Sequence, residues 1–436
     1  MSFDSIRFGE LFSEPQRNGL TRPKKVRGKG LPMVNMGELF AHPRIQNIVM
    51  DLVPVDDKEH HYLLEVGDLL FARQSLVLSG AGQCSIFLGN TESTVFESHL
   101  IRCRLNKTRV NPIFYFYFFK SPEGRRAVEA IVEQGAGASG IRGSDLVKIQ
   151  VLLPTKPVQD EVASFLGALD ERITLLRETN STLEAIAQAL FKSWFVDFDP
   201  VRTKAEGRQP QGMDAATAAL FPDSFEASEL GLVPKGWPRL AFTDTVKIIG
   251  GGTPKTSVPE YWEGHIPWFS VVDAPVITDI FVIDTVKHIS SAGLNGSSTK
   301  LLREGTTIIS ARGTVGRLAL VGKEMAMNQS CYGIQGKADD AYFTYFSTYR
   351  LVESLKQRSH GSVFDTITTE TLRGVTVIYP DMSVIEAFEV VLSPLMRRVK
   401  ENLQQSQTLT HLRDTLLPRL ISGQLRLPEA QAQLEA

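Results

Sequence analysis

Residues 144–173 read SDLVKIQVLLPTKPVQDEVASFLGALDERI, and residues 370–399 read ETLRGVTVIYPDMSVIEAFEVVLSPLMRRV. The two stretches superpose without a gap and place Pro154 on Pro380, which is an offset of 226 residues (380 − 154). This period is far longer than the roughly 20 to 50 residues of solenoid repeats, so each copy should have a core of its own. The pattern therefore predicts a tandem duplication of a mixed domain followed by a helix.

Short apolar runs punctuated by Gly, Pro and Asn predict strands in each copy, and runs with helical spacing predict helices. The expected strands are YLLEVGDLLFARQS (62–75), QCSIFLG (83–89) and VKIQVLL (147–153) in the first copy, and TTIISARG (306–313), GRLALVG (316–322) and GVTVIYP (374–380) in the second. The expected helices cover 112–135 and 341–359. Both copies end with a loop, a strand, a proline and a helix, which indicates an α+β fold made of two mixed α/β domains.

The helix after each of these prolines has apolar residues at alternating spacings of four and three. The seam residues are Val162, Leu166, Leu169, Ile173, Leu176, Asn180, Leu183, Ala187 and Leu190 in the first helix, and Phe388, Leu392, Leu395, Val399, Asn402, Ser406, Leu409, Arg413 and Leu416 in the second. A seam sustained over about four heptads requires a partner helix, which the duplication supplies. Polar residues in both seams favour a single register over maximal stability. The alternative is that each helix packs on its own domain.

Pro394 predicts an interruption of the second helix, because proline lacks a backbone donor and clashes with the preceding turn. Ser393, which precedes it, is a good N-cap residue. We therefore expect a short helix, a break near 393–394 and then a long helix, with the matching break at 167–168 in the first copy.

These features divide the chain into six segments. They are a first mixed domain at 1–155, a first helical region at 156–196, a linker at 197–237, a second mixed domain at 238–380, a second helical region at 381–425 and a C-terminal tail at 426–436. The linker is rich in Pro, Gly and acids, and we expect Phe195, Phe198, Phe221 and Trp237 to order part of it.

Composition excludes several classes of protein. The hydrophobic content of 42% and the charged content of 22% are ordinary for a globular domain. No run of about 18 apolar residues could span a bilayer, and the first residues have no signal-peptide pattern, so we expect a cytoplasmic protein without membrane segments. The three cysteines, Cys84, Cys103 and Cys331, are too few and too scattered for a disulfide framework or a zinc site.

The formal charge of −2 does not indicate a nucleic-acid binder, but the distribution of charge is uneven. The stretch RNGLTRPKKVRGKG at 17–30 holds six cations and no acid. It is either a solvated flexible loop or a loop that faces DNA phosphates. The second reading makes Arg22, Lys24, Lys25 and Arg27 candidate phosphate contacts.

The chain lacks recognisable catalytic motifs. GAGASG at 135–140 has the dinucleotide-binding glycine spacing, but a helix precedes it and a strand follows it, which is the wrong context. GGGTPKT at 250–256 lacks the spacing of a Walker loop, and His60–His61 beside acidic residues fits a solvated turn better than a metal site. These observations favour a binding protein over an enzyme.

Six blocks of sequence carry a family resemblance. They are LFKSWFVDFDPVR (190–202), LFPDSFEASELGLVPKGW (220–237), GGTPKTSVPEYWEGHIPW (251–268), SARGTVG (310–316), MNQSCYGI (327–334) and LRDTLLPRLISGQL (412–425). Together they resemble the DNA-specificity subunit of Type I restriction-modification systems, and the resemblance extends over nearly the whole chain. It is weakest at residues 1 to about 60, where the first copy has no GGTP…YW…IPW pattern.

The resemblance implies a fold, a function and partners. Such subunits have two target recognition domains, which read the two halves of a split sequence in double-stranded DNA and are held apart by two long antiparallel helices. A pseudo-two-fold axis would then match the two-fold symmetry of duplex DNA. The resemblance also implies two methyltransferase subunits that use S-adenosylmethionine and two restriction subunits that use ATP and Mg²⁺, with no catalytic residue, metal or cofactor in this chain.

Side-chain chemistry selects candidate contacts to the DNA. Cations neutralise phosphates, and an Asn or Gln amide can pair with adenine. The candidates are Arg22, Lys24, Lys25, Arg27, Arg73 and Arg142 in the first copy, and Lys255, Thr256, Arg312, Thr314, Asn328, Gln329 and Ser362 in the second. Arg73 falls opposite Arg312 within a slip of one residue. The alternatives to a specificity subunit are a stand-alone bipartite DNA-binding regulator and an enzyme with an unrecognised site.

Overall fold

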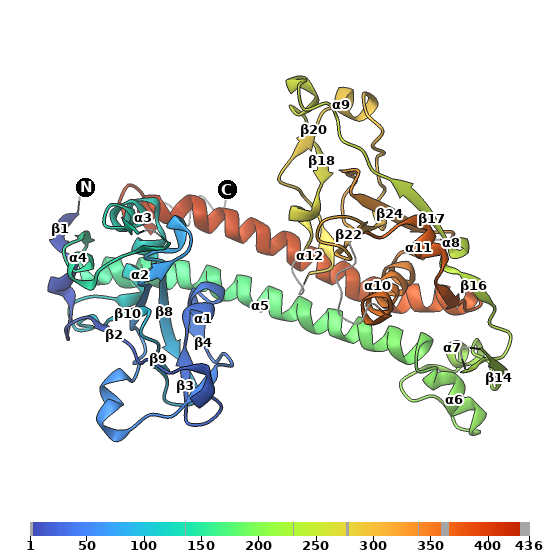
Figure 1. Cartoon of the computed structure of the whole chain (residues 1–436), viewed down its shortest axis with the longest axis horizontal. Coiled ribbons are helices and arrows are strands. Elements are labelled where there is room, and N and C mark those ends of the chain that lie inside the picture. Colours follow the sequence, from blue (N-terminus) through green and yellow to red (C-terminus); the bar gives the residue numbers. More distant parts are fainter. Residues whose placement is uncertain are drawn as a thin grey trace. The chain divides into compact units, whose positions relative to one another are not determined.

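The computed structural model describes residues 3–135, 137–229, 231–275, 279–338, 340–358 and 366–427. The chain forms two compact units. Unit 1 contains residues 1–172 and 408–436, and unit 2 contains residues 173–407. Figure 1 shows the elements of both units along the chain. Each unit therefore takes part of both long helices, in contrast to the sequence-based division, which treated the helical regions as separate segments.

Unit 1 is built on one five-stranded sheet with three smaller sheets. The order of the large sheet is β2 (Arg17–Asn18), β10 (Leu100–Cys103), β6 (Leu69–Ala72), β8 (Cys84–Gly89) and β4 (Arg44–Gln46). The smaller sheets join β5 (Asp51–Val53), β3 (Leu31–Val34) and β9 (Val95–Phe96); β11 (Glu133–Gln134), β12 (Ser139–Gly140) and β7 (Gln74–Ser75); and β1 (Asp4–Arg7) and β13 (Gln150–Leu153). The pairs β4–β8 and β3–β9 are parallel.

Unit 2 repeats this topology, except that its described residues form no counterpart of the β11–β12–β7 sheet. Its large sheet has the order β17 (Val246–Gly250), β24 (Cys331–Gly336), β21 (Thr307–Ser310), β22 (Leu318–Val321) and β19 (Phe281–Val282). The smaller sheets join β20 (His288–Ile289), β18 (Ile266–Phe269) and β23 (Ala326–Met327), and β16 (Arg239–Ala241) and β25 (Thr376–Ile378). The pairs β19–β22 and β18–β23 are again parallel. The structure confirms the predicted duplication of a mixed α/β domain.

Helices flank the sheets in both units. In unit 1 these are α1 (Met36–Ala41), α2 (Pro112–Lys120), α3 (Pro122–Glu129) and α4 (Gly143–Leu146), and in unit 2 they are α8 (Phe242–Thr245), α9 (Ser291–Asn295), α10 (Ala341–Arg358) and α11 (Thr369–Arg373). The Asn111 side chain caps α2 by accepting a hydrogen bond from Ile113 N (2.9 Å), and Pro112 occupies the first turn, where no donor is needed. Phe114 to Phe119 of α2 are buried in the core of unit 1.

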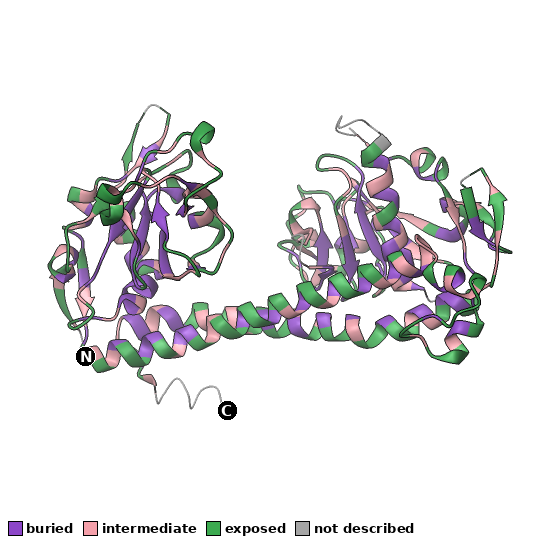
Figure 2. Ribbon diagram, turned by 90° about the horizontal axis from the view of Figure 1, so that it is seen from below, coloured by how far each residue is buried: buried purple, intermediate pink, exposed green. Residues whose placement is uncertain are grey.

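The long helices are α5 (Lys156–Phe195) and α12 (Met382–Ile421). In unit 2 the ring of Phe191 lies 5.9 Å from that of Phe388, and Asn402 Nδ2 donates to Asn180 Oδ1 (2.9 Å). Because residue numbers fall along α12 as they rise along α5, the two helices are antiparallel. In unit 1 the end of α12 packs against α5 through Leu416 and Leu166 in a common core. Figure 2 shows buried residues inside each sheet and along both helices.

The seam residues are buried or half-buried. Leu166, Ile173, Leu392, Val399 and Leu416 are buried, and Leu169, Leu183, Leu190, Leu395 and Leu409 are half-buried. The α2 helix and the β-strands of unit 1 contribute to the same core as Leu166 and Leu416. Each long helix therefore packs both on the other helix and on the neighbouring domain, so the two packing arrangements considered from the sequence coexist.

The predicted break at Pro394 is wrong. The α12 helix continues through it, and α5 continues through 167–168. Pro394 and Val390 both lie on the exposed face of α12, so water can satisfy the Val390 carbonyl that loses its helical donor. Instead of capping a new helix, Ser393 Oγ donates to Glu389 O (2.7 Å), which is the back-bonding available to serine inside a helix.

The segment between the copies contains α6 (Asp199–Ala205), α7 (Ala215–Ala219) and the hairpin of β14 (Phe225–Ser228) and β15 (Gly231–Pro234). Phe221 and Trp237 are buried in the core of unit 2, and Phe195 and Phe198 pack against it. The ring of Trp194 meets that of Phe221 at 5.1 Å in an edge-on contact. These aromatic residues anchor the segment to unit 2.

Candidate DNA interface

The strand registers extend the repeat into the first 60 residues. Pro32 of LPMV (31–34) pairs with Leu52, as Pro267 of IPWF (266–269) pairs with His288. Val34 and Phe269 then pair with Phe96 and Met327 in parallel ladders. The first copy thus has a counterpart of the IPW block at residues 31–34, which the sequence comparison missed. The signal was the shared apolar–Pro–apolar–apolar order, with no Trp to reveal it.

Two of the sequence blocks of the second copy, at 251–268 and 327–334, meet at one place in unit 2. An added Cβ at Gly251 would lie 1.9 Å from Asn328 O, and one at Gly252 would lie 2.3 Å from Ser298 Oγ. Gly252 N donates to Met327 O (3.0 Å), and Trp268 Nε1 donates to Gly252 O (3.0 Å). Only glycine permits this close approach, so GGTP, IPW and MNQS form a single loop cluster.

The same close approach occurs in unit 1. An added Cβ at Gly19 would lie 2.0 Å from Phe96 O, and Leu20 N donates to Phe96 O (2.8 Å). Gly19 therefore corresponds to Gly251. The registers also place Glu97 and Ser98 of unit 1 where unit 2 has Asn328 and Gln329. The two units therefore share the backbone arrangement of these loops, whereas the side chains on the loops differ.

The candidate residues of the GGTP and MNQS loops are on the surface of unit 2. Lys255, Thr256 and Gln329 are exposed, and Asn328 is half-buried. Asn328 Oδ1 accepts a hydrogen bond from Ser330 N (3.0 Å), and Gln329 Oε1 accepts one from Thr253 Oγ1. Each amide therefore already uses its oxygen within the loop and leaves its nitrogen as a donor.

An aromatic residue and a cation lie beside this loop cluster. The Lys287 ammonium is 5.6 Å from the centre of the Trp262 ring, and Trp262 contacts Trp268 edge-on at 5.0 Å. Trp262 and Lys287 line a surface hollow with Thr256 and His288. Glu263 also lines the hollow, so a flat ring can stack on Trp262 where Lys287 supplies a positive charge and Glu263 a negative one.

Hydrogen bonds at the hairpins after β6 and β21 show which residues of unit 1 are equivalent to Ala311 and Arg312 of unit 2. Ile141 N donates to Arg73 O (2.9 Å), and Ile367 N donates to Ala311 O (2.9 Å). Arg73 therefore corresponds to Ala311, and the residue at the place of Arg312 is Gln74. The predicted slip of one residue is resolved: the two arginines occupy neighbouring positions of the same hairpin.

The side chains at these hairpins differ in exposure. Arg312 and Thr314 are exposed, whereas Arg73 is half-buried. Arg73 lines a hollow with Gln74 and Arg142, and Arg142 forms an exposed ion pair with Glu133 (2.7 Å). Ser362 lies outside the described residues.

The basic segment of unit 1 divides into two groups. Arg22 pairs with Glu59 (2.5 Å) and Arg27 with Asp51 (2.7 Å), so these arginines hold the segment to the unit. The hydrogen bond from Arg22 lowers the pKa of the Glu59 carboxyl. Lys24 and Lys25 are exposed on a 3₁₀ turn, and neither has an acidic partner within the described part of the chain. The two lysines are therefore available to a ligand, as is exposed Lys29, which has no ion pair among the described residues.

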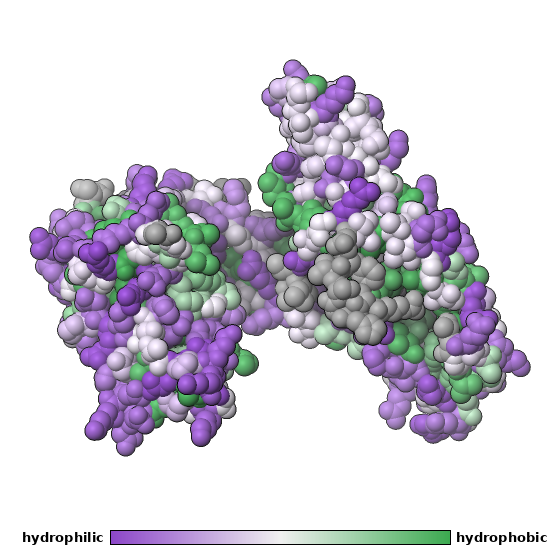
Figure 3. Space-filling model, in the orientation of Figure 1, coloured by the Kyte–Doolittle hydropathy of each residue, from purple (hydrophilic) through white to green (hydrophobic). Residues whose placement is uncertain are grey.

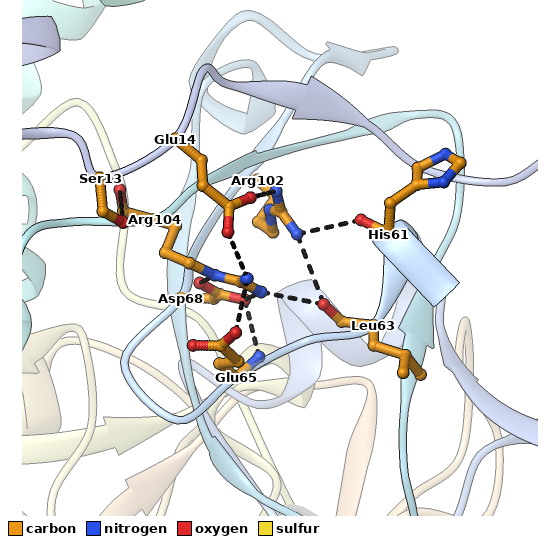
Figure 4. Close-up of polar contacts among 8 residues, drawn as sticks. All are labelled: Ser13, Glu14, His61, Leu63, Glu65, Asp68, Arg102 and Arg104. Atoms are coloured by element: carbon orange, nitrogen blue, oxygen red, sulfur yellow. Dashed lines mark hydrogen bonds and ion pairs between the residues drawn. The ribbon is translucent and has the colours of Figure 1, made fainter. Parts of the chain in front are cut away.

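A charge network in unit 1 is centred on the buried side chains of Arg102, Arg104 and Asp68 (Figure 4). Arg104 forms a two-point contact with Asp68, from Nε to Oδ1 and from Nη2 to Oδ2, both 2.8 Å. Glu14 bridges Arg104 (2.9 Å) and Arg102 (2.8 Å). Burial opposes ionisation of Glu14, but the two arginines outweigh it and lower its pKa.

The network also holds backbone, since Arg102 donates to the carbonyls of His61 and Leu63 (3.3 and 3.4 Å). In unit 2 the registers place Gln335 and Thr306 where unit 1 has Arg104 and Asp68, and Gln335 Nε2 donates to Thr306 Oγ1 (2.8 Å). A neutral pair thus replaces an ion pair at the same point of the sheet. Arg102 and Arg104 therefore stabilise the interior of unit 1 and are not candidates for contacts at its surface.

The described residues contain no group of three or more His, Cys, Asp and Glu side chains that could hold a metal ion. No helix in that part of the chain is long and apolar enough to cross a membrane. The three cysteines are buried, and burial raises the pKa of the Cys84 and Cys331 thiols to about 12. Figure 3 shows many hydrophilic residues on the visible face of unit 1 and a larger share of residues of intermediate hydropathy on that of unit 2.

Comparison with known proteins gives consistent matches. The family described as the Type I restriction modification DNA specificity domain matches residues 21–185 and 234–404, one match per copy. The HindI specificity subunit of Haemophilus influenzae is 28% identical, over 90% of this chain and 94% of that protein. The MjaIX specificity subunit of Methanocaldococcus jannaschii is 23% identical, over 72% of this chain and 69% of that protein.

A solved structure has the same fold. The S subunit of the Type I restriction-modification system from M. genitalium aligns with a TM-score of 0.57 at 15% identity, over 96% of each chain. The family match covers most of the chain, occurs once in each copy and includes the loops that carry the candidate contacts. This chain belongs to the family of Type I restriction-modification DNA specificity proteins.

Proposed function

We propose that this chain reads a split DNA target for a Type I restriction-modification complex, with one half of the target read by each unit. The proposal rests on one observation: the two units share their backbone fold, whereas the side chains on their loops differ. Both units keep the same strand order and the same glycine contact to the loop after β9 or β23. Equivalent places carry Glu97–Ser98 in unit 1 and Asn328–Gln329 in unit 2.

Different side chains at equivalent places imply different half-sites. Base edges in the major groove are told apart by hydrogen-bonding pattern and by the thymine methyl group, whereas phosphate contacts only fix orientation. Exposed Lys24, Lys25 and Lys255 are suited to phosphates, and Arg312 and Gln329 to base edges. The two halves of the target would therefore differ in sequence.

The α5 and α12 helices would set the length of the unread gap and receive two methyltransferase subunits. The buried hydrogen bond between Asn180 and Asn402 supports a fixed register, because a polar pair inside a helix seam loses its partner when the register slips. The chemistry would belong to the partners: the methyltransferase subunits would hold S-adenosylmethionine, and two restriction subunits would use ATP and Mg²⁺. Such a complex acts on chromosomal DNA in the cytoplasm.

Mapping of N6-methyladenine tests the proposal. The chain is co-expressed with the methyltransferase subunit of the same restriction-modification system in a host that lacks other adenine methylation, and the chain is omitted in the control. We expect methylation at a motif with two specific parts and a gap of fixed length. Methylation at a single contiguous motif would contradict the proposal, as would tight site-specific binding by the chain alone, which is the behaviour of a regulator.

A further inference from the structure

The hairpin after β6 is longer than its counterpart after β21. Ala72 N donates to Gln83 O and Ser310 N to Arg317 O, both at 2.9 Å, so these bonds close the two hairpins at equivalent points. Residues 73–82 lie between the first pair and residues 311–316 between the second. Unit 1 thus has four additional residues at the hairpin where unit 2 presents Arg312.

The additional residues are apolar and exposed. Leu76 is 88% exposed, Val77 61% and Leu78 49%. They form the only run of three consecutive exposed large apolar side chains among the described residues. Single exposed leucines are common on protein surfaces, but a run of three indicates a binding function. We name residues 76–78 the apolar tip.

The apolar tip is held in one conformation by its surroundings. Below it, Ser139 and Gly140 of β12 pair with Ser75 and Gln74 of β7. Val77 N donates to Ser75 Oγ (3.2 Å), and Gly80 N donates to Val77 O (3.0 Å). A preformed tip loses little conformational entropy when it binds.

A second set of contacts supports the far side of the hairpin. Arg125 of α3 donates to the carbonyls of Ser79 (3.2 Å) and Gly82 (3.5 Å). The segment 73–83 contains Arg73 and no acidic residue. The segment therefore carries no negative charge that would repel DNA phosphates, although its tip is apolar.

These features select DNA as the partner and thymine as the base. Arginine at this hairpin in unit 2 can pair with guanine, whereas leucine and valine can recognise only the thymine methyl group in the major groove. We propose that the apolar tip of unit 1 contacts thymine 5-methyl groups in the half-site that unit 1 reads. This inference rests on the proposed function and adds the class of base that one unit recognises.

Deoxyuridine substitution tests the contact, because deoxyuridine lacks only the 5-methyl group. The complex of this chain with its methyltransferase subunits is titrated with duplexes in which each thymine of the mapped target is replaced in turn. We expect about fourfold weaker binding for each contacted methyl group that is lost, and only in the half-site of unit 1. Thymines in the other half-site are the internal control.

Substitution of the tip completes the test. Leu76→Ala and Leu78→Ala should weaken binding to the thymine duplex by a similar factor and abolish its sensitivity to deoxyuridine. Leu232→Ala is the matched control, because Leu232 is 62% exposed and belongs to β15 of unit 2, far in sequence from residues 73–82. Since these side chains are exposed, thermal unfolding of the three variants should be unchanged.

Three outcomes would overturn the proposal. In the first, no deoxyuridine in the half-site changes affinity. In the second, Leu76→Ala weakens binding but leaves the deoxyuridine effect intact. In the third, Leu76→Ala impairs assembly with the methyltransferase while the assembled complex binds DNA normally, so the tip contacts protein. If exchange of residues 1–155 for those of a relative leaves both halves of the motif unchanged, the proposed function itself fails.

Discussion

The two units have the same strands but different polar interiors. Unit 1 places the ion pair of Arg104 and Asp68 between β10 and β6, and unit 2 places the neutral pair of Gln335 and Thr306 between β24 and β21. The apolar core and strand order are common to both. The apolar pattern therefore specifies the strand order and the core, whereas buried polar pairs and loop side chains can differ between the two units.

The strongest test of this comparison is an exchange of one copy. Replacing residues 238–380 with the matching segment of a relative should change one half of the methylated motif completely and leave the other intact. The large sheet of the second copy and the core cluster around Ile309 lie within the exchanged segment. A second cluster joins Phe343 and Phe346 to Phe191 outside the segment, so the relative must keep apolar residues at these positions. Methylation mapping of the chimera reports the result, and changes in both halves would contradict independent reading.

The next largest effect should come from the buried ion pair. Asp68→Ala leaves the Arg104 guanidinium buried without its two-point partner and should lower the free energy of unfolding by about 3–5 kcal/mol. Thr306→Val is the matched change in unit 2 and should lower the free energy of unfolding by about 1–3 kcal/mol. Only neutral hydrogen bonds are lost, from Gln335 Nε2 to Thr306 Oγ1 and from Thr306 Oγ1 to Arg303 O (2.7 Å). Hydrogen exchange of the full chain in denaturant resolves the two units. Equal losses of unfolding free energy in the two variants would show that the charged pair stabilises unit 1 no more than the neutral pair stabilises unit 2.

A third test uses the buried carboxyl of Glu184 in unit 2, which forms no ion pair with a Lys or Arg among the described residues. Burial raises the pKa of Glu184 to about 8, although its Oε1 accepts a hydrogen bond from Ile280 N (3.0 Å). Asp279 and Tyr345 lie near it, and Arg177 acts on Asp279. The folded state thus retains a proton that the unfolded state releases above about pH 4.3.

The stability of unit 2 should therefore depend on pH. Unit 2 should lose stability as the pH rises from about 4.3 to the folded-state pKa of Glu184, about 8, and the loss should be complete above that value. Glu184→Gln should remove this loss, by about 1.4 kcal/mol for each unit of the shift, and should have little effect below pH 4. Denaturation of the full chain between pH 5 and 9 measures the difference between variant and parent. A difference independent of pH would show that Glu184 is ionised in the folded protein.

Sequence alone predicted the duplication, the strands after residue 62 and the two long helices, because these depend on apolar spacing. It failed where a contact depends on register. Arg104 and Asp68 are 36 residues apart, and nothing in the spacing reveals that β10 and β6 bring them together. The counterpart of the IPW block at residues 31–34 was missed for a related reason, since strand pairing and not residue identity makes it equivalent.

Pro394 shows the limit of a local rule, because the helix continues through it where the freed carbonyl faces solvent. The basic segment shows a similar limit. Its six cations were considered together, but Arg22 and Arg27 have acidic partners within unit 1. Charge composition could not separate them from Lys24 and Lys25, because the partners come from distant positions in the sequence.

The smallest expected effect distinguishes these two groups of cations. Lys24→Ala or Lys25→Ala should weaken binding of the assembled complex to all DNA sequences alike and should lower the slope of log affinity against log salt by about one unit. Arg27→Ala is the control, because its guanidinium is already paired with Asp51 (2.7 Å) and releases fewer counterions on binding. Titrations at several salt concentrations, with specific and non-specific duplexes, measure both slopes. If the lysines contact phosphates, the ratio of specific to non-specific affinity stays constant while both affinities fall. A loss confined to the specific duplex would instead assign the lysines to base recognition, and an unchanged slope would make them solvated bystanders.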